Sequence, residues 1–83
     1  MQNREAIQTQ VRAYIRDRLK AKGDTRAFDD LEPLVTSGRL DSLDVVETVV
    51  FLEDAFGVNF ARFAFDLSRL DSVSTIMQLI EGA

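Results

Sequence analysis

One stretch, residues 40–58, most constrains what this chain can fold into, because it carries a helix start, a helical periodicity and a helix stop. It reads LDSLDVVETVVFLEDAFGV. Asp41 is a favourable N-cap, and Asp44 follows it at the spacing of a capping box. Gly57 can take the left-handed conformation that ends many helices. We therefore predict a helix that follows Asp41 and ends at Phe56, with Ser42 in its first turn.

This helix has two apolar stripes rather than one. At about 100° per residue, the stripe predicted to face the core holds Val45, Val49, Leu52 and Phe56. The second stripe holds Leu43, Val46 and Val50, with Glu47, Glu53 and Asp54 at its edges. Two interpretations are open. A helix that is apolar on nearly every side is usual at the centre of a bundle, whereas an apolar strip with acidic edges is typical of a docking surface for a basic partner.

The spacing of these residues resembles the acyl carrier protein family, which includes peptidyl and aminoacyl carrier domains. The matching residues are Asp41-Ser42-Leu43-Asp44, Val46-Glu47, Leu52-Glu53-Asp54 and Phe56-Gly57. The resemblance extends to chain length and element order. It implies that Ser42 is esterified by 4′-phosphopantetheine from coenzyme A, with Asp41 and Leu43 beside it. It also implies a set of partner contacts: Leu43, Asp44, Val46, Glu47, Val50 and Asp54.

The resemblance further implies a protein that catalyses nothing itself. The arm would supply the thiol that this chain lacks, and a cargo would be held there as a thioester. The implied partners are a phosphopantetheinyl transferase, an acyl- or aminoacyl-loading ligase, and a downstream transferase or synthase.

The sequence departs from the fatty-acid carriers at two places. Arg39-Leu40 stand where those carriers commonly have Gly-Ala, and Arg62, Phe63 and Phe65 stand where they tend to be acidic. The pattern Gly-x-Leu-Asp-Ser is more similar to D-alanyl carriers and to stand-alone carriers of specialised pathways. We therefore expect an aminoacyl- or D-alanyl-type pathway, or secondary metabolism, rather than housekeeping fatty acid biosynthesis.

Composition excludes several other functions. The chain has 83 residues, which is one small domain (1–83), and it contains neither cysteine nor histidine. A hydrolase that uses Ser42 would lack the usual general base, and no metal site is expected. The net charge of −4 argues against nucleic-acid binding. No apolar run is long enough to span a membrane, so we expect a cytoplasmic monomer.

Periodicity elsewhere predicts three more helices. The first covers Arg4 to Lys22, and a long loop follows that is anchored by Phe28, Leu31, Leu34 and Val35. A short helix is expected over Leu67 to Leu70 after Asp66. Asp71 or Ser72 would cap the last helix, which buries Val73, Ile76, Met77 and Ile80. The fold predicted is all-α: a small four-helix bundle that is acyl-carrier-protein-like, with a short third helix.

Charge is unevenly distributed along the chain. Residues 1–22 are basic, whereas residues 40–58 hold five acidic residues and no basic one. We expect a molecule with an acidic end at Ser42, and first-helix arginines that face solvent. An alternative function follows from the same pattern: a non-catalytic helical interaction module that docks a basic partner through its acidic second helix. Such a module would not need Ser42.

Overall fold

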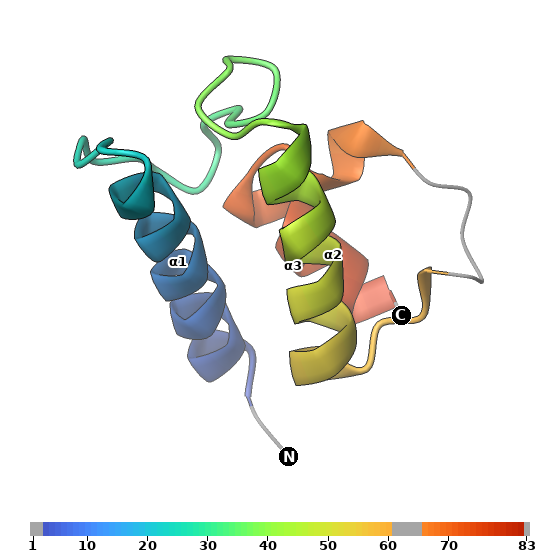
Figure 1. Cartoon of the computed structure of the whole chain (residues 1–83). Helices are drawn as coiled ribbons and strands as arrows, with labels where there is room; N and C mark the ends of the chain where they lie inside the picture. The colour runs from blue at the N-terminus through green and yellow to red at the C-terminus, as the bar shows by residue number, and fades with distance from the viewer. Residues whose placement is uncertain (1–2, 61–65, 83) are drawn as a thin grey trace.

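The computed structural model describes residues 3–60 and 66–82, and within these ranges it holds three α-helices, one short 3-10 helix and no strand. The helices are α1 (Arg4–Ala21), α2 (Ser42–Phe56), η2 (Leu67–Leu70) and α3 (Val73–Gly82) (Figure 1). The all-α class is confirmed. The four-helix bundle is not, because η2 is one 3-10 turn, too short to pack as a fourth α-helix. Arg62, Phe63 and Phe65 lie outside the described residues, so our expectations for them stay predictions.

Helix α1 begins and ends close to its predicted bounds. Asn3 caps it by accepting a 2.7 Å hydrogen bond from the backbone N–H of Ala6. Lys22 is the C-cap, and Gly23 follows with a φ of 83°, the left-handed conformation that stops the helix. The buried residues of α1 are Val11, Ile15 and Leu19, which are four residues apart and so lie on one face of the helix.

Helices α1 and α2 run antiparallel, and α3 packs behind them (Figure 1). Between them lies one apolar core. Its buried members are Val11, Ile15, Leu19, Leu34, Leu40, Val45, Leu52, Val58, Leu70, Val73, Ile76, Met77 and Leu79. Tyr14 of α1 stacks on Phe51 of α2, with ring centroids 4.1 Å apart, and so joins the two helices at the edge of this core.

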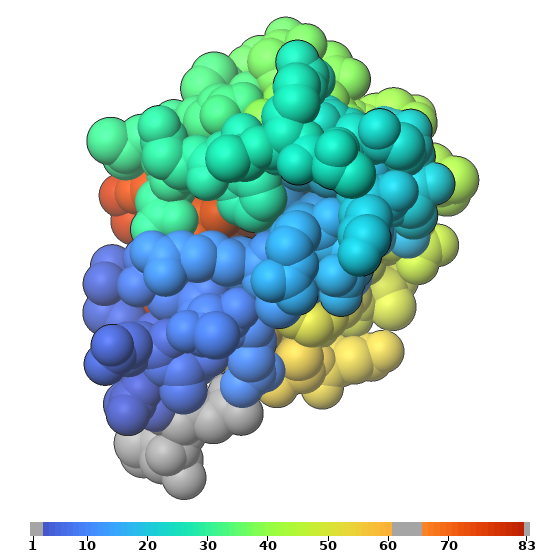
Figure 2. Space-filling view, turned by 90° about the vertical axis from the view of Figure 1, so that its left-hand side faces the viewer, coloured from blue at the N-terminus to red at the C-terminus, as the bar shows by residue number. Residues whose placement is uncertain are grey.

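The segment between α1 and α2 covers one end of the molecule, where it lies across the C-terminal end of α1 (Figures 1 and 2). Leu34 is its buried anchor, and Phe28 and Val35 pack partly against the core. Leu31, which we predicted to be an anchor, is one of the most exposed apolar side chains described. The chain reaches the core through Leu34 instead, so Leu31 is left pointing into solvent.

Ser72 and Asp71 have different structural roles at the start of α3. The hydroxyl of Ser72 accepts a hydrogen bond from the backbone N–H of Thr75, so Ser72 is the cap, and its side chain is buried. The Asp71 carboxylate instead accepts hydrogen bonds from the backbone N–H groups of Val35 (2.8 Å) and Thr36 (3.0 Å). Asp71 therefore fastens the long loop to the start of α3.

Candidate functional site

Ser42 is the first residue of α2, and a reciprocal capping box holds the turn that carries it. The backbone N–H of Asp44 donates to the Asp41 carboxylate, and the backbone N–H of Asp41 donates to the Asp44 carboxylate, both at 3.0 Å. This confirms the predicted box. The Ser42 side chain is exposed and makes no hydrogen bond with any described residue. Its hydroxyl is therefore presented to solvent from a fixed backbone.

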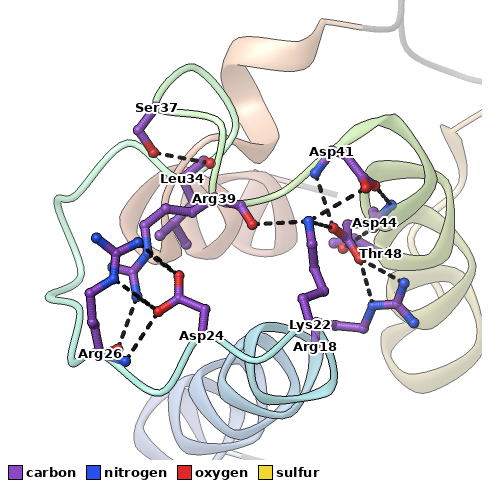
Figure 3. Close-up of polar contacts among 10 residues, drawn as sticks. All are labelled: Arg18, Lys22, Asp24, Arg26, Leu34, Ser37, Arg39, Asp41, Asp44 and Thr48. Carbon is purple, nitrogen blue, oxygen red and sulfur yellow. Dashed lines mark hydrogen bonds and ion pairs between the residues drawn. The ribbon is translucent and has the colours of Figure 1, made fainter.

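The Asp44 carboxylate lies in an ion-pair network between α1 and α2 (Figure 3). Arg18 donates two hydrogen bonds to one oxygen, at 3.1 and 2.7 Å, and the Lys22 ammonium donates one to the other at 2.7 Å. Burial alone would raise the pKa of Asp44, but Lys22, the Asp41 N–H and Arg18 together lower it to about 2. Asp44 is therefore ionised at neutral pH and acts as a structural link.

Two expectations about charge are corrected by this network. The side chain of Asp44 is only 3% exposed, so it does not belong to the surface that a partner could contact. Nor do all the cations of α1 face solvent, because Arg18 and Lys22 turn toward the start of α2. The antiparallel pairing of α1 and α2 brings the basic last turn of one helix to the acidic first turn of the other. The basic end of α1 and the acidic start of α2 therefore partly neutralise each other near Ser42.

The second apolar stripe of α2 lies on the surface. Leu43, Val46 and Val50 are all exposed, whereas Val45 and Leu52 of the first stripe are buried. One interpretation of the sequence is that α2 is apolar on nearly every side because it lies enclosed at the centre of a bundle. That interpretation is therefore wrong. Glu47, Glu53 and Asp54 are also exposed along this helix. We call the exposed residues Leu43, Val46 and Val50 the α2 apolar face.

A shallow groove begins at Ser42 and continues between α2 and η2. Its volume is about 490 Å³, and its lining is mostly apolar: Val35, Gly38, Leu40, Asp41, Ser42, Val45, Val46 and Leu67. Leu67, which is half exposed, was not among the predicted site residues. The only sequence signal for it was an apolar residue directly after the predicted cap Asp66. A smaller hollow of about 280 Å³ lies between α1 and the loop and contains none of the predicted site residues.

Arg39 fixes the chain just before Ser42. Its side chain is 8% exposed and donates to the Asp24 carboxylate at 2.9 and 3.1 Å (Figure 3). It also donates to the Glu32 carboxylate at 2.6 Å and to two loop carbonyl oxygens. Gly38 precedes it with a φ of 85°, a conformation that glycine adopts readily. In the sequence, Arg39 stands out only as a departure from the fatty-acid carriers. In the structure it ties both ends of the loop together.

Within residues 3–60 and 66–82, no cluster of three or more acidic, cysteine or histidine side chains could hold a metal ion. No described helix is long and apolar enough to cross a membrane. Comparison with known proteins found no significant match to this chain, whether with family models, curated sequences or solved structures.

Proposed function

We propose that this chain is a stand-alone carrier protein that bears a 4′-phosphopantetheine arm on Ser42 and has an acyl-carrier-protein-like fold. The observation that carries the proposal is the position of Ser42. It presents an exposed hydroxyl, with no hydrogen bond to the described part of the chain, on the first residue of a capped helix and next to an exposed apolar face. A carrier needs one such nucleophile for a modifying enzyme to reach, and it needs no catalytic base of its own.

The residues around Ser42 suit this cofactor. The phosphodiester would lie at the positive end of the α2 dipole, which favours an anion by about 0.3–1 kcal/mol. The groove that starts at Ser42 is mostly apolar and is large enough for a short flexible chain. When bound, the arm would supply a thiol on which an acyl or aminoacyl cargo is held as a thioester. The chain's own residues would present the arm and bind the enzymes that use it.

The α2 apolar face is the surface that we assign to partner enzymes. Leu43, Val46 and Val50 supply apolar contact area, and Glu47 and Asp54 supply charge for a basic counterpart. The partners proposed are a phosphopantetheinyl transferase, an acyl- or aminoacyl-loading ligase, and a downstream transferase or synthase. The pathway proposed is of the aminoacyl, D-alanyl or specialised type, because Arg39-Leu40 precede Asp41-Ser42.

The direct test is the intact mass of the protein after incubation with coenzyme A and a broad-specificity phosphopantetheinyl transferase. We expect a gain of one phosphopantetheinyl group, mapped to the peptide that contains Ser42. Ser42→Ala should gain nothing. Ser72→Ala is the matched control for the second Asp-Ser pair, and it should be modified like the wild type. Failure of a folded sample with two different transferases would contradict the proposal.

A second candidate function is a non-catalytic interaction module that docks a basic partner through α2. The exposed apolar face with its acidic neighbours favours it. The two functions differ in their need for Ser42. Ser42→Ala would leave a docking module fully active, whereas it would abolish every function of a carrier. Val46→Asp should impair both.

A further inference from the structure

The Lys22 ammonium contacts three acceptors, and all three belong to the turn that carries Ser42. It donates to the backbone carbonyl of Arg39 at 3.1 Å and to the Asp44 carboxylate at 2.7 Å, and it lies 3.4 Å from the Asp41 carboxylate (Figure 3). An ammonium group has three donors, and hydrogen bonds to Arg39 and Asp44 use two of them. We call residues 39–41 the leading turn, because they connect the loop to α2.

Lys22 is well placed to hold this turn, because its own backbone is fixed. It is the C-cap of α1, and its backbone N–H donates to the carbonyl of Leu19 at 3.0 Å. The side chain therefore runs from one helix end to the start of the next. Ser42, by contrast, has no side-chain hydrogen bond of its own among the described residues. The position of its hydroxyl depends on the backbone that Lys22 and the capping box hold.

The contacts of Lys22 and Arg18 are not equivalent. Asp44 has two hydrogen bonds from Arg18 and two capping-box hydrogen bonds with Asp41, and none of these involves Lys22. Among the residues described, no other cation is within ion-pair distance of Asp41, nor does another side chain bind the Arg39 carbonyl. Loss of Lys22 should therefore remove the contact between the leading turn and the end of α1. The capping box, the Arg39 side-chain contacts and the buried Leu40 should keep the turn folded.

We propose that Lys22 is a positioning residue for the modification of Ser42, an inference that rests on the proposed carrier function. In that reaction the Ser42 oxygen attacks the phosphorus of coenzyme A that bears the pantetheine. The bond from that phosphorus to the bridging oxygen breaks, adenosine 3′,5′-bisphosphate leaves, and the serine proton passes to a base of the transferase. Lys22 orients the attacking oxygen through the leading turn. It also offsets the charge of Asp41, which would otherwise repel the anionic donor.

The experiment compares rates of modification by one transferase across three variants. Lys22→Met should lower kcat/KM by about 10-fold, less than the ~100-fold that an ångström of misplacement can cost. Lys22→Arg keeps the charge and the reach, and should restore most of the rate. Lys20→Met is the matched control. The substitution removes the same charge from the last turn of α1, and Lys20 does not contact the leading turn. It should be modified at the wild-type rate.

Two further readouts separate positioning from a general loss of structure. The circular dichroism of Lys22→Met should match that of the wild type, and most of its defect should persist at saturating coenzyme A, as a fall in kcat. The proposal is overturned if Lys22→Met is modified at the wild-type rate, if Lys20→Met is slowed equally, or if Lys22→Met loses its helices. A wild-type protein that gains no arm would instead overturn the carrier function itself, so the two failures are distinguishable.

Discussion

Val45 and Val46 are neighbours in the chain, yet Val45 is 5% exposed and Val46 is 57% exposed. Both lie on α2, where one step turns the side chain by about 100°. The first packs into the core beside Leu52, and the second belongs to the α2 apolar face. The same substitution at these two positions therefore probes the two faces of one helix turn.

Val45→Asp should unfold the domain or lower its free energy of unfolding by about 3–5 kcal/mol, because it places an unpaired charge in the core. Val46→Asp should leave the free energy of unfolding nearly unchanged, since its side chain stays in solvent. Urea denaturation followed by circular dichroism measures both. Equal loss of helix in the two variants would show that the faces of α2 are wrongly assigned.

Asp44→Ala should destabilise the fold by about 2–4 kcal/mol, because it breaks the capping box and leaves Arg18 and Lys22 without their shared acceptor. The comparison variant is Glu53→Ala, on the exposed side of the same helix, where little change is expected. Chemical denaturation at neutral pH gives both values. A loss at Asp44 no larger than at Glu53 would contradict the role of the network.

The lowered pKa of Asp44 predicts that the protein loses stability in acid. The pKa of Asp44 in the folded protein is about 2, below the unfolded value near 4. A group with a depressed folded pKa stabilises the fold above its unfolded pKa and loses that contribution as the pH falls through the folded one. Asp44 should therefore contribute about 2 kcal/mol at pH 7, and this should disappear between about pH 4 and pH 2.

Denaturation of the wild type and of Asp44→Asn across this pH range tests the assignment. The amide of the variant cannot ionise, so the difference in unfolding free energy between the two proteins should shrink as the pH falls from about 4 to about 2. Other carboxylates with lowered pKa values, such as Asp30 and Asp71, titrate in both proteins and cancel in the difference. A difference that stays constant over this range would assign the acid sensitivity elsewhere.

Arg39→Ala should lower the free energy of unfolding by about 2 kcal/mol and open the loop to proteases, because several loop acceptors lose their donor together. Arg26→Ala is the matched control. Arg26 binds the same Asp24, but its side chain is 74% exposed, against 8% for Arg39. Its loss should have little effect. Limited proteolysis that cleaves both variants equally would refute the distinction.

The local elements of this fold could be predicted from sequence because their signals lie within a few residues of each other. The capping box joins Asp41 to Asp44, three positions along the chain, and Gly57 ends α2 through its own backbone conformation. The buried face of α1 and the two faces of α2 follow from helical periodicity. The place of Ser42 as the first residue of α2 follows from the cap at Asp41.

Tertiary structure decided which of these side chains are paired inside the fold and which are exposed to a partner. Asp44 looks like a surface acid in the sequence, but it is enclosed by Arg18 and Lys22, which precede it by 26 and 22 residues. Arg39 binds the loop acids, and Asp71 binds loop backbone 35 residues away. Leu67 and Val46 line the same groove as Ser42. Periodicity and capping describe only neighbours along the chain. The pairing of distant charges depends on how the helices pack, and in this protein that packing sets the charge and the support around Ser42.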